Sequence, residues 1–126
     1  MILGIDYGQS MVGLAISSGD QSEALMTVAR GEAVARIEII CKKEHVDKIV
    51  IGMPHGRLQI QVEEFGRALK EKLKLDIVYH DETLTSRYAA EILNEVGTTP
   101  KKKQVREHAL AAALILQSYL DEIKHL

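Results

Sequence analysis

Three polar side chains stand where predicted strands end and where the last predicted helix begins. Asp6 lies near the end of an apolar run from Met1 to Tyr7, and Glu82 follows the run Leu75–Tyr79. His108 shares one helical stripe with three apolar residues, Ala112, Ile115 and Tyr119. Two carboxylates and an imidazole could hold a divalent cation, since carboxylate oxygen suits Mg²⁺ and Mn²⁺ and imidazole favours Mn²⁺.

The chemistry of such a cluster follows from its charge. Carboxylates brought together from separate elements repel each other unless protons or cations offset them. A pair of divalent cations can hold both the attacking water and the leaving oxygen of a phosphodiester. An ordinary structural interpretation also stands: Asp6 would cap a turn, Glu82 would start a helix, and His108 would be a solvated helix residue. Spacing alone does not separate the two.

The spacing of apolar residues changes along the chain, and it predicts the strands and helices that must position these residues. Three short apolar runs, 1–7, 12–17 and 24–29, are separated by turn residues and predict an antiparallel meander. Helical and buried-strand patterns then alternate. Their expected bounds are helix 33–41, strand 47–53, helix 58–73, strand 75–79, helix 85–96, loop 98–103 and a last helix from Gln104.

This order predicts an α/β fold with a mixed five-stranded sheet, in which three antiparallel strands are followed by two parallel ones. Helices should cover both faces of the sheet. A length of 126 residues predicts one domain over 1–126. In such a sheet ligands gather beyond the carboxyl ends of the parallel strands, where Asp6 and Glu82 are expected.

Composition restricts the class of function. The net charge of −2 argues against a generally basic nucleic-acid coat, so a polyanion would need a local basic patch or cations. One cysteine, Cys41, excludes an intrachain disulfide and a Cys-rich zinc site. Apolar runs are shorter than the roughly 18 residues of a membrane span, and an acid follows at position 6, so we expect a cytoplasmic protein and no membrane partner. Scarce aromatics argue against a base-stacking platform of the kind that single-strand-binding proteins use.

Four segments carry a family resemblance that extends from residue 2 to residue 121. They are ILGIDYGQSMVGLAIS, DKIVIGMPHG, HDETLTSRYAAEIL and HALAAALILQSYLD. In this order they resemble the YqgF family, whose members are described as candidate Holliday junction resolvases or as candidate nucleases that mature the 5′ end of pre-16S rRNA. The resemblance implies an RNase H-like fold and a metal-bound acidic triad, with Asp6 and Glu82 at its first two positions and His108 at its third.

The sequence departs from the family pattern at positions that concern charge. The third member of the triad is usually aspartate, and the first loop usually reads Gly-Thr-Lys-Arg-Ile-Gly where this chain has GQSMVG at 8–13. Losing these cations should weaken contacts with phosphates. The residues that we expect to bind substrate in their place are Ser10, Arg57, Arg87, Lys101, Lys102, Lys103 and Arg106. The alternative for the 101–106 stretch is an ordinary solvated loop.

The leading hypothesis is a nuclease that depends on Mg²⁺ or Mn²⁺ and acts on structured nucleic acid. Asp6 and Glu82 would hold the ions, and His108 would be a third ligand or a proton shuttle. Precursor rRNA is the favoured substrate; a four-way DNA junction is the alternative and would require a homodimer, whereas a monomer favours RNA. Two other readings stay open, a non-catalytic nucleic-acid-binding module and a phosphotransfer enzyme, although the latter needs a second domain.

Overall fold

The computed structural model describes residues 1–82 and 100–124, and side chains over 1–82 and 107–124. The elements, in chain order, are β1 (Ile2–Tyr7), β2 (Met11–Ser18), β3 (Gln21–Ala29), the 3₁₀ turn η1 (Arg30–Glu32), α1 (Ala33–Lys43), β4 (Lys48–Met53), α2 (Leu58–Leu73), β5 (Asp76–Asp81) and α4 (Pro100–Lys124).

The five strands form one mixed sheet in the order β3-β2-β1-β4-β5. The pairs β3–β2 and β2–β1 are antiparallel, and β1–β4 and β4–β5 are parallel. The central strands β1 and β4 each carry four consecutive buried residues because both of their faces are covered. This arrangement confirms the predicted α/β class and the predicted division into antiparallel and parallel strands.

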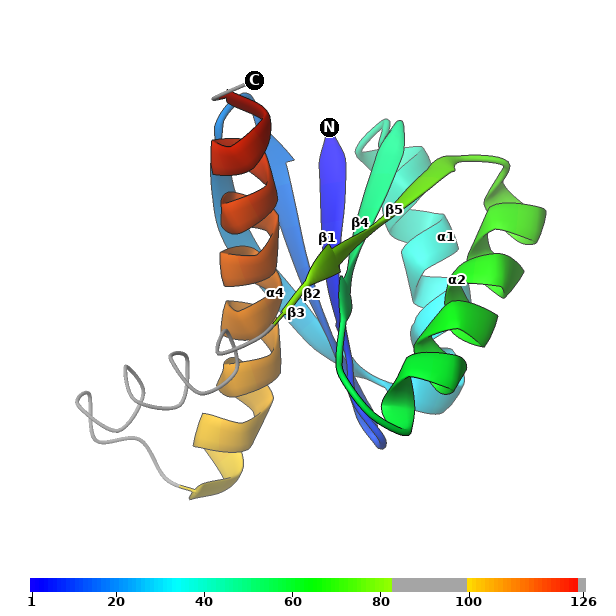
Figure 1. Cartoon of the computed structure of the whole chain (residues 1–126), viewed down its shortest axis with the longest axis vertical. Helices are drawn as coiled ribbons and strands as arrows, with labels where there is room; N and C mark the ends of the chain where they lie inside the picture. Colours follow the sequence, from blue (N-terminus) through cyan, green and yellow to red (C-terminus); the bar gives the residue numbers. More distant parts are fainter. Residues whose placement is uncertain (83–99, 125–126) are drawn as a thin grey trace.

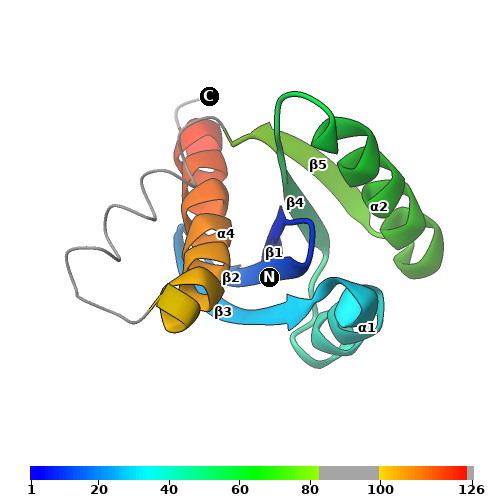
Figure 2. The same cartoon turned by 90° about the horizontal axis from the view of Figure 1, so that it is seen from below.

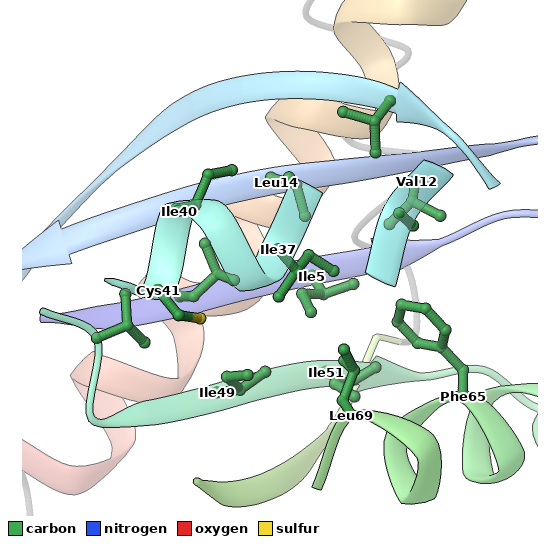
Figure 3. Close-up of a cluster of buried hydrophobic side chains, with 14 of the residues drawn as sticks. Ile5, Val12, Leu14, Ile37, Ile40, Cys41, Ile49, Ile51, Phe65 and Leu69 are labelled. Atoms are coloured by element: carbon green, nitrogen blue, oxygen red, sulfur yellow. The ribbon is translucent and has the colours of Figure 1, made fainter. Parts of the chain in front are cut away.

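Helices cover both faces of the sheet, as the sequence predicts (Figures 1 and 2). On one face α1 and α2 enclose the larger apolar cluster, and Figure 3 shows Ile5, Leu14 and Ile51 of the sheet facing Ile37 and Leu69 of these helices. On the other face α4 covers a smaller cluster, which contains Ala15, Val50, Ala112, Ile115 and Leu116. Side chains alternate between these clusters along each strand, as the pleat of a sheet requires.

Glycines in β1 and β2 allow α4 to lie directly on the sheet. A methyl group on Gly4 would stand 2.8 Å from Cβ of Leu116, and one on Gly13 would collide with the carbonyl group of His108. Gly13 is also paired with Asp6 across β1 and β2. The absence of side chains here therefore sets how closely His108 approaches Asp6.

Three predicted boundaries are corrected. Strand β3 begins at Gln21 rather than Ala24, and β5 continues beyond Tyr79 to Asp81. The expected loop at 98–103 is wrong for Lys101–Lys103, because α4 already begins at Pro100. Proline is favoured in the first turn of a helix and lysine is a good helix former, so this stretch continues the helix. The helix expected over 85–96 lies outside the described residues.

Candidate active site

Asp6 lies near the carboxyl end of β1 and faces α4. Its residue exposure is only 5%, which is unusual for a carboxylate. Its neighbour Ile5 belongs to the cluster on the opposite face, so the alternation of the strand turns Asp6 toward the helix. Oδ2 of Asp6 lies 3.0 Å from Nδ1 of His108, within hydrogen-bond distance. A buried acid at this edge is thus held by a partner that is distant in sequence.

His108 reaches Asp6 from the N-terminal part of α4. The predicted stripe places Ala112, Ile115 and Tyr119 in or beside the sheet, and His108 lies on the same face one turn earlier. Its ring also fits against Gly8, where an added Cβ would stand 2.8 Å from Cε1 of His108. The hydrogen bond to Asp6 raises the pKa of His108, the charges of Asp6 and Glu107 add to this, and burial opposes it.

Glu82 follows β5 directly and turns its carboxyl group toward Asp6. Its backbone N–H donates to the carbonyl oxygen of Met53 at 3.3 Å, which ties it to the end of β4. Gly52 leaves space for this side chain, since an added Cβ there would stand 2.7 Å from Oε2 of Glu82. Burial raises the pKa of Glu82 to about 8, and the charge of Asp6 and a hydrogen bond with Asp6 contribute further. At neutral pH the carboxyl group of Glu82 is therefore mostly protonated.

The donor atoms of Asp6, Glu82 and His108 are of the kinds that bind a divalent cation, but the three side chains are not arranged around a common point. Oε2 of Glu82 is buried and has no hydrogen-bond partner among the described residues, and a cation would satisfy it. The donor set of two carboxyls and one imidazole suits Mg²⁺ or, better, Mn²⁺. However, no group of three His, Cys, Asp or Glu side chains in the described part of the chain is arranged to hold a metal ion. The hydrogen bond to His108 engages Asp6 instead.

The residues expected to bind substrate are only partly described. Ser10 is exposed in the turn between β1 and β2, and Arg57 is exposed just before α2. Arg87 lies outside the described residues. Lys101, Lys102, Lys103 and Arg106 belong to the first two turns of α4, but their side chains also lie outside the described part. The basic stretch is therefore helical, and it leads directly to His108.

A histidine–aspartate pair outside the residues expected to bind substrate lies at the same end of the sheet. Nε2 of His55, in the β4–α2 loop, is 3.3 Å from Oδ1 of Asp81, and both side chains are largely exposed. Asp81 and Glu82 face opposite sides of the sheet, as the extended backbone requires. The parallel pairing of β4 with β5 would have indicated the contact, because Met53 pairs with Asp81.

Comparison with known proteins decides the family. The sequence model of RuvX, described as "Holliday junction resolvase", matches residues 1–122. The chain belongs to this family. Two relatives named "Putative pre-16S rRNA nuclease" share most of their length with it. The protein of Syntrophus aciditrophicus is 41% identical over 97% of this chain and 89% of its own. That of Caldanaerobacter subterraneus subsp. tengcongensis is 38% identical over 98% of each chain. The recognition made from the four motifs is confirmed.

A solved structure confirms the fold of this RuvX-family chain. "T. thermophilus RuvC in complex with Holliday junction substrate" superposes with a TM-score of 0.62 over 98% of this chain and 95% of that one. The two sequences are 12% identical, so the likeness concerns the fold, which is RNase H-like as expected. None of the described helices is both long and apolar enough to cross a membrane.

Proposed function

We propose that this chain is a nuclease that uses Mg²⁺ or Mn²⁺ to hydrolyse phosphodiesters in structured RNA, and that its substrate is the 5′ end of pre-16S rRNA. The observation that carries the proposal is the close approach of buried Asp6 and half-buried Glu82, because Oε2 of Glu82 is itself buried and has no hydrogen-bond partner among the described residues. Membership of the RuvX family and the names of the relatives support it. We infer that residues 1–126 act as one catalytic domain, in the cytoplasm.

Asp6 and Glu82 are the residues that would hold the cation. When bound, it would neutralise the charge that develops on the phosphate and lower the pKa of water at the site. Glu82 must first lose the proton that burial and Asp6 favour on it, so cation and proton compete for the same oxygens. Cδ1 of Ile115 and Oε2 of Glu82 both lie beside Gly52, so apolar surface borders this carboxyl group and limits the access of bulk water to it.

His108 has a different role from the aspartate that the family usually has at its position. Its Nδ1 bonds to Oδ2 of Asp6, so it orients that carboxylate and removes one of its free electron pairs. With Nδ1 donating, Nε2 remains able to accept a proton from water or give one to a leaving oxygen. We therefore assign His108 as a proton carrier that positions Asp6, with direct ligation as the alternative.

The phosphate contacts that we propose come from residues around this edge of the sheet. Ser10 and Arg57 are exposed there, and helix α4 carries Lys101, Lys102, Lys103 and Arg106 toward the site. Arg87 is retained as a candidate from the sequence. Together these cations would offset the net charge of −2 locally, as binding of a polyanion requires.

Resolution of a Holliday junction is the second candidate, because it is the description of the family. A resolvase must cut two strands symmetrically and would therefore act as a homodimer, whereas an RNA-processing nuclease can act as a monomer. Sedimentation of the protein with and without a four-way junction distinguishes these cases. A third outcome, binding without cleavage, would identify a non-catalytic module.

The test measures cleavage of an end-labelled 5′-extended 16S rRNA fragment and of a four-way DNA junction, with Mg²⁺ or Mn²⁺. Asp6→Asn should abolish cleavage. Asp47→Asn is the matched control, since it removes the same charge from an exposed position at the opposite end of the sheet. His108→Asp should shift the preference from Mn²⁺ toward Mg²⁺, because a carboxylate replaces an imidazole. Cleavage of neither substrate at high protein concentration would refute the catalytic proposal.

A further inference from the structure

A groove lies between β5 and α2, on the face of the sheet away from α4. Its volume is about 390 Å³, which is within the range of sites that enclose a small ligand. Met53 and Ile77 contribute apolar surface from the strands, Tyr79 contributes an aromatic ring, and Arg67 and Lys70 contribute positive charge from α2. This combination suits a unit that is both flat and anionic.

Tyr79 is held in place yet partly open to solvent. Its exposure is 40%, although it is a large aromatic residue. Its hydroxyl group occupies the space that a side chain on Gly66 would fill, so the ring is fixed against α2. Burial and the nearby charge of Glu63 raise the pKa of Tyr79, and Arg67 opposes this, so the ring stays neutral. A fixed, neutral ring can stack on a base with little loss of conformational entropy.

Two cations stand beside this ring. Arg67 and Lys70 are exposed, are three residues apart on α2 and share one side of the helix. Lys70 also borders a second hollow, in which Glu71 and Asp76 balance Lys70 and Lys74. The positive charge beside the ring therefore comes from Arg67 and Lys70. Glu63 is the acidic residue of the groove itself, which leaves an excess of positive charge.

The groove and the candidate active site meet at Met53, at the end of β4. Met53 lines the groove with its side chain, while its carbonyl oxygen accepts the N–H of Glu82. Tyr79 precedes Glu82 by three strand residues, about 10 Å, which is the length of about three stacked nucleotides. The two side chains face opposite sides of the sheet, so a strand passing from one to the other must bend over its edge. A single strand can do this and a stiff duplex cannot.

We propose that the groove between β5 and α2 binds the single-stranded RNA next to the cleavage point, with Tyr79 stacking on a base and Arg67 and Lys70 contacting phosphates. The proposal rests on the proposed nuclease function and adds a feature of the substrate to it. The protein would recognise an unpaired segment beside the structured part of the RNA. It requires one ring, which is compatible with the scarcity of aromatic residues in this chain.

The test is a binding measurement that does not depend on cleavage. A fluorescently labelled RNA hairpin with a short single-stranded 5′ extension and the same hairpin without it are titrated with the full chain carrying Asp6→Asn. Fluorescence anisotropy gives both dissociation constants at salt concentrations between about 50 and 200 mM. Further substitutions are added to this parent protein, and thermal unfolding verifies that each variant is folded.

We expect Tyr79→Leu to weaken binding of the extended hairpin about tenfold and to leave the blunt hairpin unaffected, whereas Tyr79→Phe keeps the ring and the affinity. Arg67→Gln together with Lys70→Gln should lower the slope of log affinity against log salt by about 1.4. Arg36→Gln removes an equally exposed arginine from α1 and is the matched control, with no change expected.

Three results would overturn the proposal: the parent binds both hairpins equally, the groove variants bind the extended hairpin as the parent does, or they lose affinity for both hairpins alike. A fourth result would also overturn it. If sedimentation shows that the parent is a dimer and that substitution of Arg67 and Lys70 dissociates it, the groove is an interface between copies of the chain. Failure of the wild type to cleave, with extension-dependent binding intact, would refute only the proposed nuclease.

Discussion

Replacing Glu82 by glutamine should stabilise the cation-free protein at high pH and flatten the pH dependence of its stability. The pKa of Glu82 is about 8 in the folded chain, against an ordinary value of 4.5. Between these values the folded state holds a proton that the unfolded state has released. The unfolding free energy must therefore fall as the pH rises from about 4.5 to about 8. His108 acts in the same direction, since its raised pKa gives a stabilisation that is present below 6.5 and lost at higher pH.

The magnitude follows from the two pKa values of Glu82. Their difference corresponds at most to roughly 5 kcal/mol. Glu82 is only partly shielded from solvent, and screening reduces this to about 1–2 kcal/mol. For a chain of this size that is a shift in melting temperature of roughly 3–8 °C. Glu82→Gln removes the titrating group and retains a side chain that can hydrogen-bond to Asp6, so the part of the pH dependence that Glu82 causes should disappear.

The assay is thermal unfolding followed by circular dichroism, in EDTA, at pH values from 4.5 to 8. Because other groups also titrate, the decisive quantity is the difference between the wild type and Glu82→Gln at each pH. Glu64→Gln, at an exposed position of α2, is the matched control and should parallel the wild type. A difference that does not change with pH would refute the raised pKa of Glu82. Adding Mn²⁺ should stabilise the wild type more at pH 8 than at pH 4.5, because the cation replaces the proton on Glu82.

Three further predictions concern packing. Gly13→Ala should destabilise the fold by about 1–3 kcal/mol in urea unfolding, because the new methyl group collides with the carbonyl of His108; a smaller loss would mean that α4 can move. Gly66→Ala should also destabilise, and Tyr79→Phe should recover part of the loss, which a double-mutant cycle measures; additive effects would contradict the contact. Burial raises the pKa of Cys41 to about 11, so native protein should react with iodoacetamide at neutral pH far more slowly than urea-unfolded protein, and equal rates would contradict its burial.

The sheet was predictable because its signals are local. Continuous apolar runs in β1 and β4 indicate strands covered on both faces, and short turns between the first three strands fix their antiparallel pairing. The start of α4 is not apparent from the sequence, because three consecutive lysines are typical of a solvated loop, whereas Pro100 can begin a helix and lysine can continue it. A run of charges reports solvation and says little about backbone conformation.

The sequence predicts which residues lie together at the candidate site, but it does not predict the hydrogen bonds and protonation that they have there. Asp6, Glu82 and His108 could be placed at one edge from strand order, helical stripe and family motif. The hydrogen bond between His108 and Asp6 depends on how closely α4 approaches the sheet, and Gly8 and Gly13 set that approach through a contact across about a hundred residues. The proton on Glu82 depends on burial by Gly52 and Ile115, which no spacing in the sequence encodes.

The repulsion between Asp6 and Glu82 is reduced in this structure in two ways that a cation would replace. Glu82 carries a proton, and His108 engages one oxygen of Asp6. Both arrangements occupy electron pairs that a cation would need, so a cation held by Asp6 and Glu82 would compete with the proton on Glu82 and with the hydrogen bond between His108 and Asp6.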